Sequence, residues 1–290
     1  MPDPKSAVIL GARSIVGAYL AQRLAAAGYG GLCSGRASSH PGDSLPPGFT
    51  WQRLDPAAPG DWHCPADAIV FSLFPLPHLA PLLPHLSEAK QIIAVSTSGL
   101  LYKKDSDDPE ERAYMARLEA TEAALRDLCA GHGIGWTLLR PTLIYRPGRD
   151  KNVTAVARFI ERFGCFPVAS PARGLRQPVH ADDVAQAAAA AADNPAAQGQ
   201  TFFLPGAETL TYREMVARIF VALGRRPVIL ALPAGLLGLA LRLGRAITGS
   251  AYSPALFARM NADLTFDPSA AIEVLDYAPR AFQPDFGESG

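Results

Sequence analysis

Residues 7–28, AVILGARSIVGAYLAQRLAAAG, constrain the fold of this chain more than any other stretch. A short apolar run, residues 7–10, stops at Gly11, and apolar residues then recur at helical spacing from Ile15 to Leu24. We therefore predict a strand, a tight turn carrying Gly11 and Gly17, and a helix, which together form the first half of a βαβ unit. Such a turn directs backbone N–H groups and the positive end of a helix dipole to one point, where a pyrophosphate can bind.

The glycine spacing alone leaves two interpretations open. A G-x-x-G-x-x-G dinucleotide fingerprint needs glycine at position 14, where this chain has Ser14. The turn is either a nucleotide site or an ordinary tight connection from strand to helix. In a nucleotide site, the Ser14 backbone still approaches the pyrophosphate and its hydroxyl donates to a phosphate oxygen.

The end of the next predicted strand, residues 31–36, indicates which dinucleotide would bind. In βαβ sites an acidic residue there bonds the ribose hydroxyls of NAD, whereas an arginine accommodates the 2′-phosphate of NADP. No Asp or Glu occurs between Gly11 and His40, while Arg36 ends the strand and Arg13 lies in the turn. Two guanidinium groups can clamp a phosphate, so NADP(H) is predicted in preference to NAD(H). The alternative is that both are solvated surface arginines.

Composition favours a globular protein without a nucleic-acid partner. The 290 residues suffice for one large domain, or a large and a small one, and 27 Lys and Arg balance 27 Asp and Glu. The four cysteines lack C-x-x-C spacing, so neither a metal site nor a disulfide framework is predicted. Reduced thiols and the lack of a long apolar leader predict a cytoplasmic location.

One uncharged stretch raises the question of membrane contact. Residues 228–241 contain Pro233 and lie between Arg226 and Arg242, and they are too few to span a bilayer. They either form a core helix under a substrate pocket or lie on a membrane surface, in which case residues 236–247 make a peripheral contact.

Further along the chain, strands are predicted at residues 49–55, 68–73, 91–96, 136–144 and 201–204. Residues 74–85 contain four prolines and are not expected to form one regular helix. Asp55 ends a strand and is predicted to accept from an adenine amino group. Helices are predicted at residues 114–129, after residues 178–184 with Asp182 or Asp183 as cap, and from Thr209 or Thr211 through Leu223, the last with Glu214 in a capping box.

These motifs together carry a family resemblance. VILGARSIVG, VSTSGLLY, Tyr114 with Glu122 eight residues on, LLRPTLIYRPGRD, QPVHADDVAQA and LPGAETLTYREM occur in this order over nearly the whole chain. The chain resembles the short-chain dehydrogenase/reductase superfamily, in its extended and atypical branch similar to NAD(P)-dependent epimerases and dehydratases. The resemblance implies an α/β fold with a Rossmann-type doubly wound parallel sheet and a smaller C-terminal substrate lobe.

The resemblance also implies domains and roles. Residues 1–205 would bind NAD(P), and residues 206–290 would form the substrate lobe, with residues 146–177 as a possible addition. The substrate would be a small carbonyl compound or a sugar nucleotide. Cofactor contacts would come from Gly11, Arg13, Ser14, Ile15, Gly17, Arg36, Asp55 and Arg140. Ser98 would polarise the substrate carbonyl, and Tyr114 would transfer the proton.

One family position is not matched. The lysine expected four residues after the tyrosine is Leu118 here. A tyrosine pKa is near 10, so ionising one at neutral pH costs roughly 4 kcal/mol without a nearby cation. Arg117, Lys103 or Lys104 could supply that cation, or Tyr114 could act as a neutral donor. In a third interpretation the protein is a nucleotide-bound scaffold or regulatory protein without turnover.

Overall fold

The computed structural model describes residues 5–38, 45–233 and 259–287 of the chain, which forms two compact units. Unit 1 comprises Met1–Pro141, Ala181–Leu204 and Asp267–Ala278, and unit 2 comprises Thr142–His180, Pro205–Phe266 and Pro279–Gly290. The chain thus passes between the units several times. Residues 267–278, which the sequence places with the C-terminal lobe, belong to unit 1, and residues 142–180 belong to unit 2.

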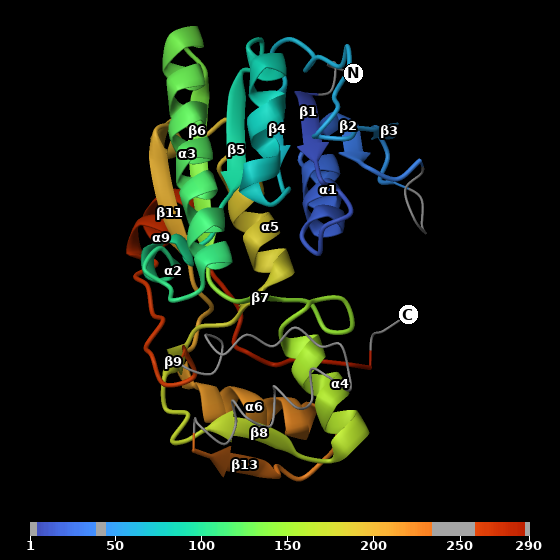
Figure 1. The fold of residues 1–290 in the computed structure, drawn as a ribbon. Coiled ribbons are helices and arrows are strands. Elements are labelled where there is room, and N and C mark those ends of the chain that lie inside the picture. Colours follow the sequence, from blue (N-terminus) through green and yellow to red (C-terminus); the bar gives the residue numbers. More distant parts are fainter. Residues whose placement is uncertain (1–4, 39–44, 234–258, 288–290) are drawn as a thin grey trace. The chain divides into compact units, whose positions relative to one another are not determined.

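Unit 1 is built on a seven-stranded sheet in which all the strands are parallel (Figure 1). Its strand order is β11-β6-β5-β4-β1-β2-β3. The strands are β1 (Lys5–Leu10), β2 (Tyr29–Gly35), β3 (Phe49–Arg53), β4 (Ile69–Ser72), β5 (Gln91–Val95), β6 (Gly135–Pro141) and β11 (Gln200–Leu204). The order reverses direction between β1 and β4, and this is where open α/β sheets bind ligands.

Helices cover both faces of this sheet. Since β2 and β5 lie on opposite sides of the β1–β4 pair, right-handed crossovers place their helices on opposite faces. Helix α1 (Gly17–Ala26) packs against α5 (Ala181–Ala190), and α3 (Pro109–His132) packs against the 3₁₀ helix η1 (Leu76–Leu86). A short helix α2 (Leu100–Lys103) packs on α3, and α9 (Ser269–Leu275) packs on β11 and α5. The predicted doubly wound α/β fold is confirmed.

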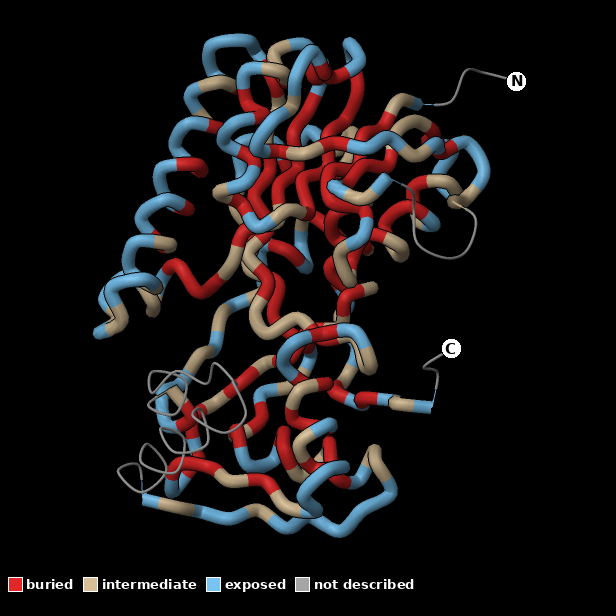
Figure 2. Tube along the Cα trace, turned by 45° about the vertical axis from the view of Figure 1, so that its right-hand side comes forward, coloured by how far each residue is buried: buried red, intermediate tan, exposed pale blue. Residues whose placement is uncertain are grey.

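The central strands of the sheet are buried (Figure 2), because β1, β4 and β5 carry mainly apolar residues, whereas β3 at the edge is largely exposed. All four residues of β4, IVFS, are buried, as expected for a strand covered on both faces. Apolar side chains of η1 and α3 complete a core with β4 and β5.

Local structure differs from the predictions at four places. The Asp108 side chain caps α3 by accepting from the backbone of Glu110 and Glu111, so this helix begins before residue 114 and Tyr114 lies in its second turn. Strand β6 ends at Pro141 instead of continuing to residue 144. Residues 76–86 form one 3₁₀ helix. Asp182 and Asp183 lie in the first turn of α5 rather than capping it.

Unit 2 has its own core. Helices α4 (Val153–Phe163) and α6 (Tyr212–Ala222) pack together beside two-stranded pairings of short strands. These pairings are β7 (Ile144–Tyr145) with β10 (Val179–His180), β9 (Leu175–Arg176) with β12 (Leu210–Thr211), and β8 (Phe166–Ala169) with β13 (Ile229–Leu232). The predicted capping box of α6 is confirmed, with Thr211 as N-cap. No helix in the described ranges is both long and apolar enough to cross a membrane. Residues 236–247 lie outside those ranges.

Candidate functional site

The turn after β1 lies at the carboxyl edge of the sheet and is held on two sides. The backbone N–H groups of Gly11 and Ala12 donate to the Ser34 carbonyl of β2 at 3.1 and 2.9 Å. Gly11 has φ +79°, and a Cβ there would lie 3.0 Å from the backbone N of Phe74, just after β4. Only glycine meets both demands without strain. The turn therefore spans the switch point between β1 and β4.

The second glycine lets α1 start directly against this turn. A Cβ on Gly17 would lie 2.0 Å from the Ala12 carbonyl oxygen, which excludes any side chain. The Ser14 hydroxyl accepts a hydrogen bond from the Gly17 N–H at 3.2 Å, so Ser14 supports the start of the helix and keeps its own proton for donation. Arg13 and Ile15 flank Ser14 in the same turn. The first-turn N–H groups of the helix lie at the edge where a pyrophosphate would sit.

Arginines gather at the ends of β2 and β3. The Arg13 Cδ lies 3.8 Å from where a Gly35 Cβ would be, and the Trp51 ring lies on the same spot at 2.9 Å. Arg36 follows Gly35 directly and is exposed, and its carbonyl accepts from Arg53 Nε at 3.3 Å. The structure thus places Arg13 and Arg36 at one strand end.

Sequence reasoning missed Arg53. In the parallel ladder Arg53 pairs with Gly35, so the last residue of β3 lies beside Arg36. The sequence did contain a signal for Arg53, because two successive predicted strands each have an arginine at or near their end. Only the register of the two strands shows that these arginines lie side by side.

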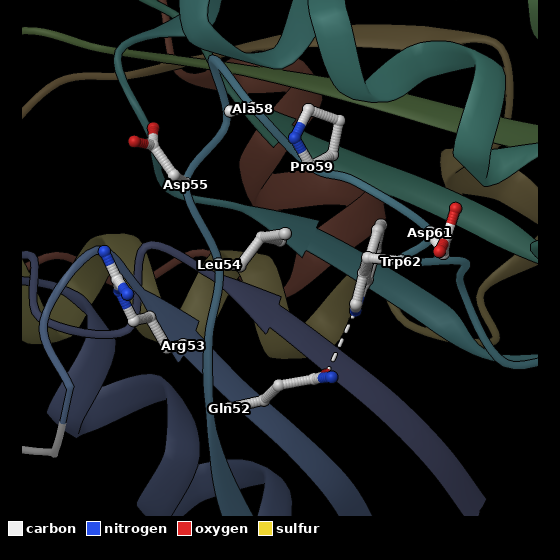
Figure 3. A pocket seen from close by; sticks show the side chains of 8 residues that line it. All are labelled: Gln52, Arg53, Leu54, Asp55, Ala58, Pro59, Asp61 and Trp62. Atoms are coloured by element: carbon white, nitrogen blue, oxygen red, sulfur yellow. Dashed lines mark hydrogen bonds between the residues drawn. The ribbon is translucent and has the colours of Figure 1, made fainter.

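A polar pocket of about 530 Å³ opens at the end of β3 (Figure 3). It is lined by Gln52, Arg53, Leu54, Asp55, Ala58, Pro59, Asp61 and Trp62. Trp62 Nε1 donates to Gln52 Oε1 at 3.0 Å, and Asp55 Oδ1 accepts from the Ala57 N–H at 3.1 Å. The second Asp55 carboxylate oxygen has acceptor capacity for an amino group.

Of the three hydroxyl groups after β5, two make hydrogen bonds within the protein. Ser96 Oγ donates to Glu122 at 2.7 Å, and Thr97 Oγ1 accepts from the Gly99 N–H at 3.0 Å. Ser98 is buried, and its N–H donates to the Pro141 carbonyl at the end of β6. Within the described part of the chain the Ser98 hydroxyl makes no hydrogen bond to protein, so it can serve a ligand.

Tyr114 is a protonated phenol in this environment. Burial raises its pKa, and the charge of Arg117 lowers it by less. Of the three cations considered for this role, Arg117 is the one that acts on Tyr114, whereas Lys103 pairs with Glu111 at 3.1 Å. Leu118 is 2% exposed and packs into the core, so that position offers no cation.

Arg140 belongs to a largely buried ion network. Its Nη2 lies 2.6 Å from Glu122 Oε2 and its Nε lies 3.3 Å from Oε1. Arg126 adds a contact at 3.0 Å, and Glu122 itself is 1% exposed. The network joins α3 to the ends of β5 and β6. It can position Tyr114, which lies on α3, and Ser98, which follows β5 in the chain.

The described residues contain no group of three or more His, Cys, Asp or Glu arranged to hold a metal ion.

Comparison with known proteins gives the same fold. No family model matches the chain. UDP-glucose 4-epimerase of Vibrio cholerae is 25% identical over 122 residues, which are 42% of this chain and 37% of that enzyme. The matched segment therefore spans little more than a third of the relative.

Solved structures match over nearly the whole chain. An epimerase from Methanothermobacter thermautotrophicus has a TM-score of 0.72 at 15% identity, covering 98% of this chain and 90% of its own. UDP-glucuronic acid 4-epimerase from Bacillus cereus, solved with NAD, has a TM-score of 0.70 at 15% identity, with 97% and 93% covered. UDP-glucose 4-epimerase from Thermotoga maritima, solved with UDP-glucose, has a TM-score of 0.66 at 17% identity, with 95% and 94% covered. The chain therefore has the same fold as these epimerases, which agrees with the fold that its motifs imply.

Proposed function

We propose that this protein is an NADP(H)-dependent oxidoreductase or epimerase that acts on a carbonyl group of a small molecule or sugar nucleotide. One observation carries the cofactor assignment: Arg13 lies over Gly35, beside Arg36 and Arg53, at the strand end where this fold binds the adenosine ribose. Arginines at positions 13 and 36, with Arg53 next to Arg36 and no Asp or Glu between Gly11 and Arg36 in the sequence, favour a 2′-phosphate. NAD is bound by structural neighbours such as the Bacillus cereus enzyme, so the phosphate preference is specific to this proposal.

The remaining cofactor contacts follow from the turn. The pyrophosphate would lie on the N–H groups between Gly11 and Gly17, with the Ser14 hydroxyl as an added donor. Asp55, at the rim of the pocket after β3, would accept from the adenine amino group. When bound, the nicotinamide supplies or takes a hydride.

The chain's own residues orient the carbonyl and supply a proton. Ser98 offers a hydroxyl that would orient the substrate carbonyl, and Tyr114 offers a neutral phenol that would donate a proton to the carbonyl oxygen in a reduction. A protonated tyrosine suits reduction of a carbonyl better than proton abstraction from an alcohol. The glycine-rich turn, the arginines, Ser98 and Tyr114 all belong to unit 1.

Nicotinamide fluorescence tests the cofactor assignment. NADPH should bind more tightly than NADH, and Arg13→Ala or Arg36→Ala should weaken NADPH by roughly tenfold or more while leaving NADH within a few-fold, since a hydrogen bond to a charged group contributes about 1.5–3 kcal/mol. Lys90→Ala, which removes an exposed cation just before β5, at the amino edge of the sheet, is the matched control. Equal affinity for the two cofactors would refute the NADP preference.

In a second candidate function, the protein binds the nucleotide but does not catalyse a reaction. Leu118, buried in the core where the family places a lysine, favours a nucleotide-bound scaffold or regulatory protein. Oxidation of NADPH with a panel of carbonyl compounds and UDP-sugars separates the two. Turnover that falls in Tyr114→Phe supports the enzyme, while tight NADPH binding without turnover on the whole panel supports the scaffold.

As part of this proposal we place the protein in the cytoplasm. All four cysteines are free thiols, and burial raises the pKa of Cys33 and Cys64 to about 12. Such thiols fit a reducing compartment.

A further inference from the structure

Unit 2 exposes apolar side chains that its fold does not use. Six large hydrophobic residues of the described ranges are exposed, and four of them belong to unit 2: Phe163 (52% exposed), Val221 (67%), Val228 (46%) and Leu230 (44%). In β13, Ile229 and Leu232 pack on the core while Leu230 is exposed. Burying any of these four would be favourable.

Hydrogen bonds show that these residues come from adjoining ends of elements. The Phe166 N–H, at the start of β8, donates to the Val228 carbonyl at 2.9 Å. Arg225 Nη1 donates to the carbonyls of Ile160 and Glu161 at the end of α4, at 2.9 and 3.2 Å. The Arg225 N–H also donates to the Phe220 carbonyl at the end of α6. The ends of α4 and α6 therefore meet the start of β13.

Arginines lie beside two of these apolar residues, Phe163 and Val228. Arg162 lies over the Phe163 ring at 5.2 Å, and Arg226 is exposed between Arg225 and Val228. Glu161 is the acidic side chain in the last turn of α4. Long arginine side chains can lie along apolar surface and keep their charge at its rim.

The charge of the whole unit has the same sign. Among described residues, unit 2 carries 13 Lys and Arg against 6 Asp and Glu, whereas unit 1 carries 12 against 18. The neutral balance of the full chain hides this division. A positively charged unit with exposed apolar side chains and neighbouring arginines complements a surface that is negative outside and apolar beneath.

We propose that this docking face, made of Phe163, Val221, Val228 and Leu230 with Arg162 and Arg226, binds an anionic lipid surface. The apolar side chains enter the headgroup boundary and the arginines pair with lipid phosphates and carboxylates. A nucleic acid would use the arginines but not four exposed aliphatic and aromatic groups. This inference does not depend on the proposed function, because docking requires neither cofactor nor turnover.

Sedimentation of the full chain with vesicles tests the proposal. The protein should pellet with phosphatidylserine and phosphatidylcholine in equal parts at low salt, stay in the supernatant with phosphatidylcholine alone, and be released by salt. Arg162→Gln with Arg226→Gln should weaken binding roughly 5-fold per arginine. Val228→Asp with Leu230→Asp should weaken it at least roughly tenfold, because two apolar insertions are lost.

Leu101→Asp with Ile272→Asp is the matched control, since these residues are 49% and 50% exposed but belong to unit 1. It should sediment like the unaltered protein, and each variant should keep the unaltered melting temperature and solution mass. The proposal is overturned if the protein stays in the supernatant, or if it binds both vesicle types equally. It is also overturned if the docking-face variants bind vesicles as well as the unaltered protein does. In that case, loss of binding on substitution within residues 236–247 would assign the contact to that segment. A change of solution mass in the Val228→Asp and Leu230→Asp variant would point to a second copy of the chain instead.

Discussion

At the scale of single residues, comparing Gly11 with Gly28 separates the cost of a positive φ from the cost of a steric clash at the Cβ. Both have φ near +80°, but a Cβ would touch the Phe74 backbone at Gly11 and nothing within 4 Å at Gly28. Gly28→Ala should cost about 1–2 kcal/mol of unfolding free energy for its backbone conformation alone. Gly11→Ala should cost more and also weaken NADPH binding. Urea unfolding of both variants measures the difference. Equal costs would mean that Phe74 shifts away from the new Cβ without a loss of stability.

Glu122 is the residue whose charge matters most to the core of unit 1. It is 1% exposed and accepts from Ser96, Arg126 and Arg140. Glu122→Gln should lower the free energy of unfolding by about 3 kcal/mol, because the partly buried Arg140 loses its counter-charge. Glu119→Gln, exposed on the same helix, should change it by less than about 0.5 kcal/mol. Chemical denaturation of the two variants provides the comparison.

At the scale of elements, the start of α6 depends on one capping box. Thr211 Oγ1 accepts from the Glu214 N–H at 3.1 Å, and Glu214 Oε2 accepts from the Thr211 N–H at 2.7 Å. Thr211→Ala should therefore cost about 1 kcal/mol. Thr209→Ala, two residues away, loses one exposed hydrogen bond from Gln177 and should cost less. If thermal melts rank the two variants the other way, the cap is not what fixes this helix start.

Asp193 links β1, β2 and the start of β5 through charge. Lys5 and Lys90 contact its carboxylate at 3.0 and 2.5 Å, and the Tyr29 hydroxyl donates to it at 2.9 Å. Hydrogen bonds from Lys90 and Lys5 lower the pKa of Asp193 to about 2, while burial, with the contact to Asp193, raises the pKa of Tyr29 to about 12.

Two pH windows follow from these shifts. The Asp193 contribution to stability is complete above about pH 4 and is lost as pH falls toward 2. The Tyr29 contribution is complete below about pH 10 and is lost as pH rises toward 12. Asp193→Asn should flatten the acid limb, by roughly 1 kcal/mol after allowance for the exposed lysines, and should reduce the alkaline limb only in part, because burial is the larger cause of the Tyr29 shift. Asp127→Asn, on the exposed side of α3, should leave the pH profile of unfolding free energy unchanged.

At the scale of the whole molecule, the C-terminal region supports unit 1. Leu275 of α9 is 2% exposed, whereas Ile272 of the same helix is 50% exposed. Leu275→Ala should destabilise the protein by about 2–4 kcal/mol, and Ile272→Ala by well under that. Hydrogen exchange should show the loss of protection in β11 and α5, on which α9 packs. Protection lost only in unit 2 would contradict this role.

The sequence predicted most of the elements of unit 1, because their determinants are local. Apolar runs between glycines predict parallel strands, and helical spacing after Gly17 predicts α1. Predicted boundaries were wrong where a single capping side chain sets them. Asp108 caps α3, so this helix begins at Pro109 and Tyr114 lies in its second turn. The pairing of Arg140 with Glu122 was not predicted, because a motif shows neighbours along the chain and not partners on another element.

The sequence by itself determined the turn at Gly11 and the presence of arginine just after β2, because each depends on residues close together in the chain. It also indicated the fold class, through the order of motifs along the chain. The tertiary structure alone decided which distant residues share a site or a unit. Strand register brought Arg53 beside Arg36, packing buried Leu118, and repeated crossing of the chain assigned residues 267–278 to unit 1. The same crossings divide a neutral chain into an acidic unit and a basic one. Charge separation of this kind depends on which segments fold together, which local sequence patterns do not encode.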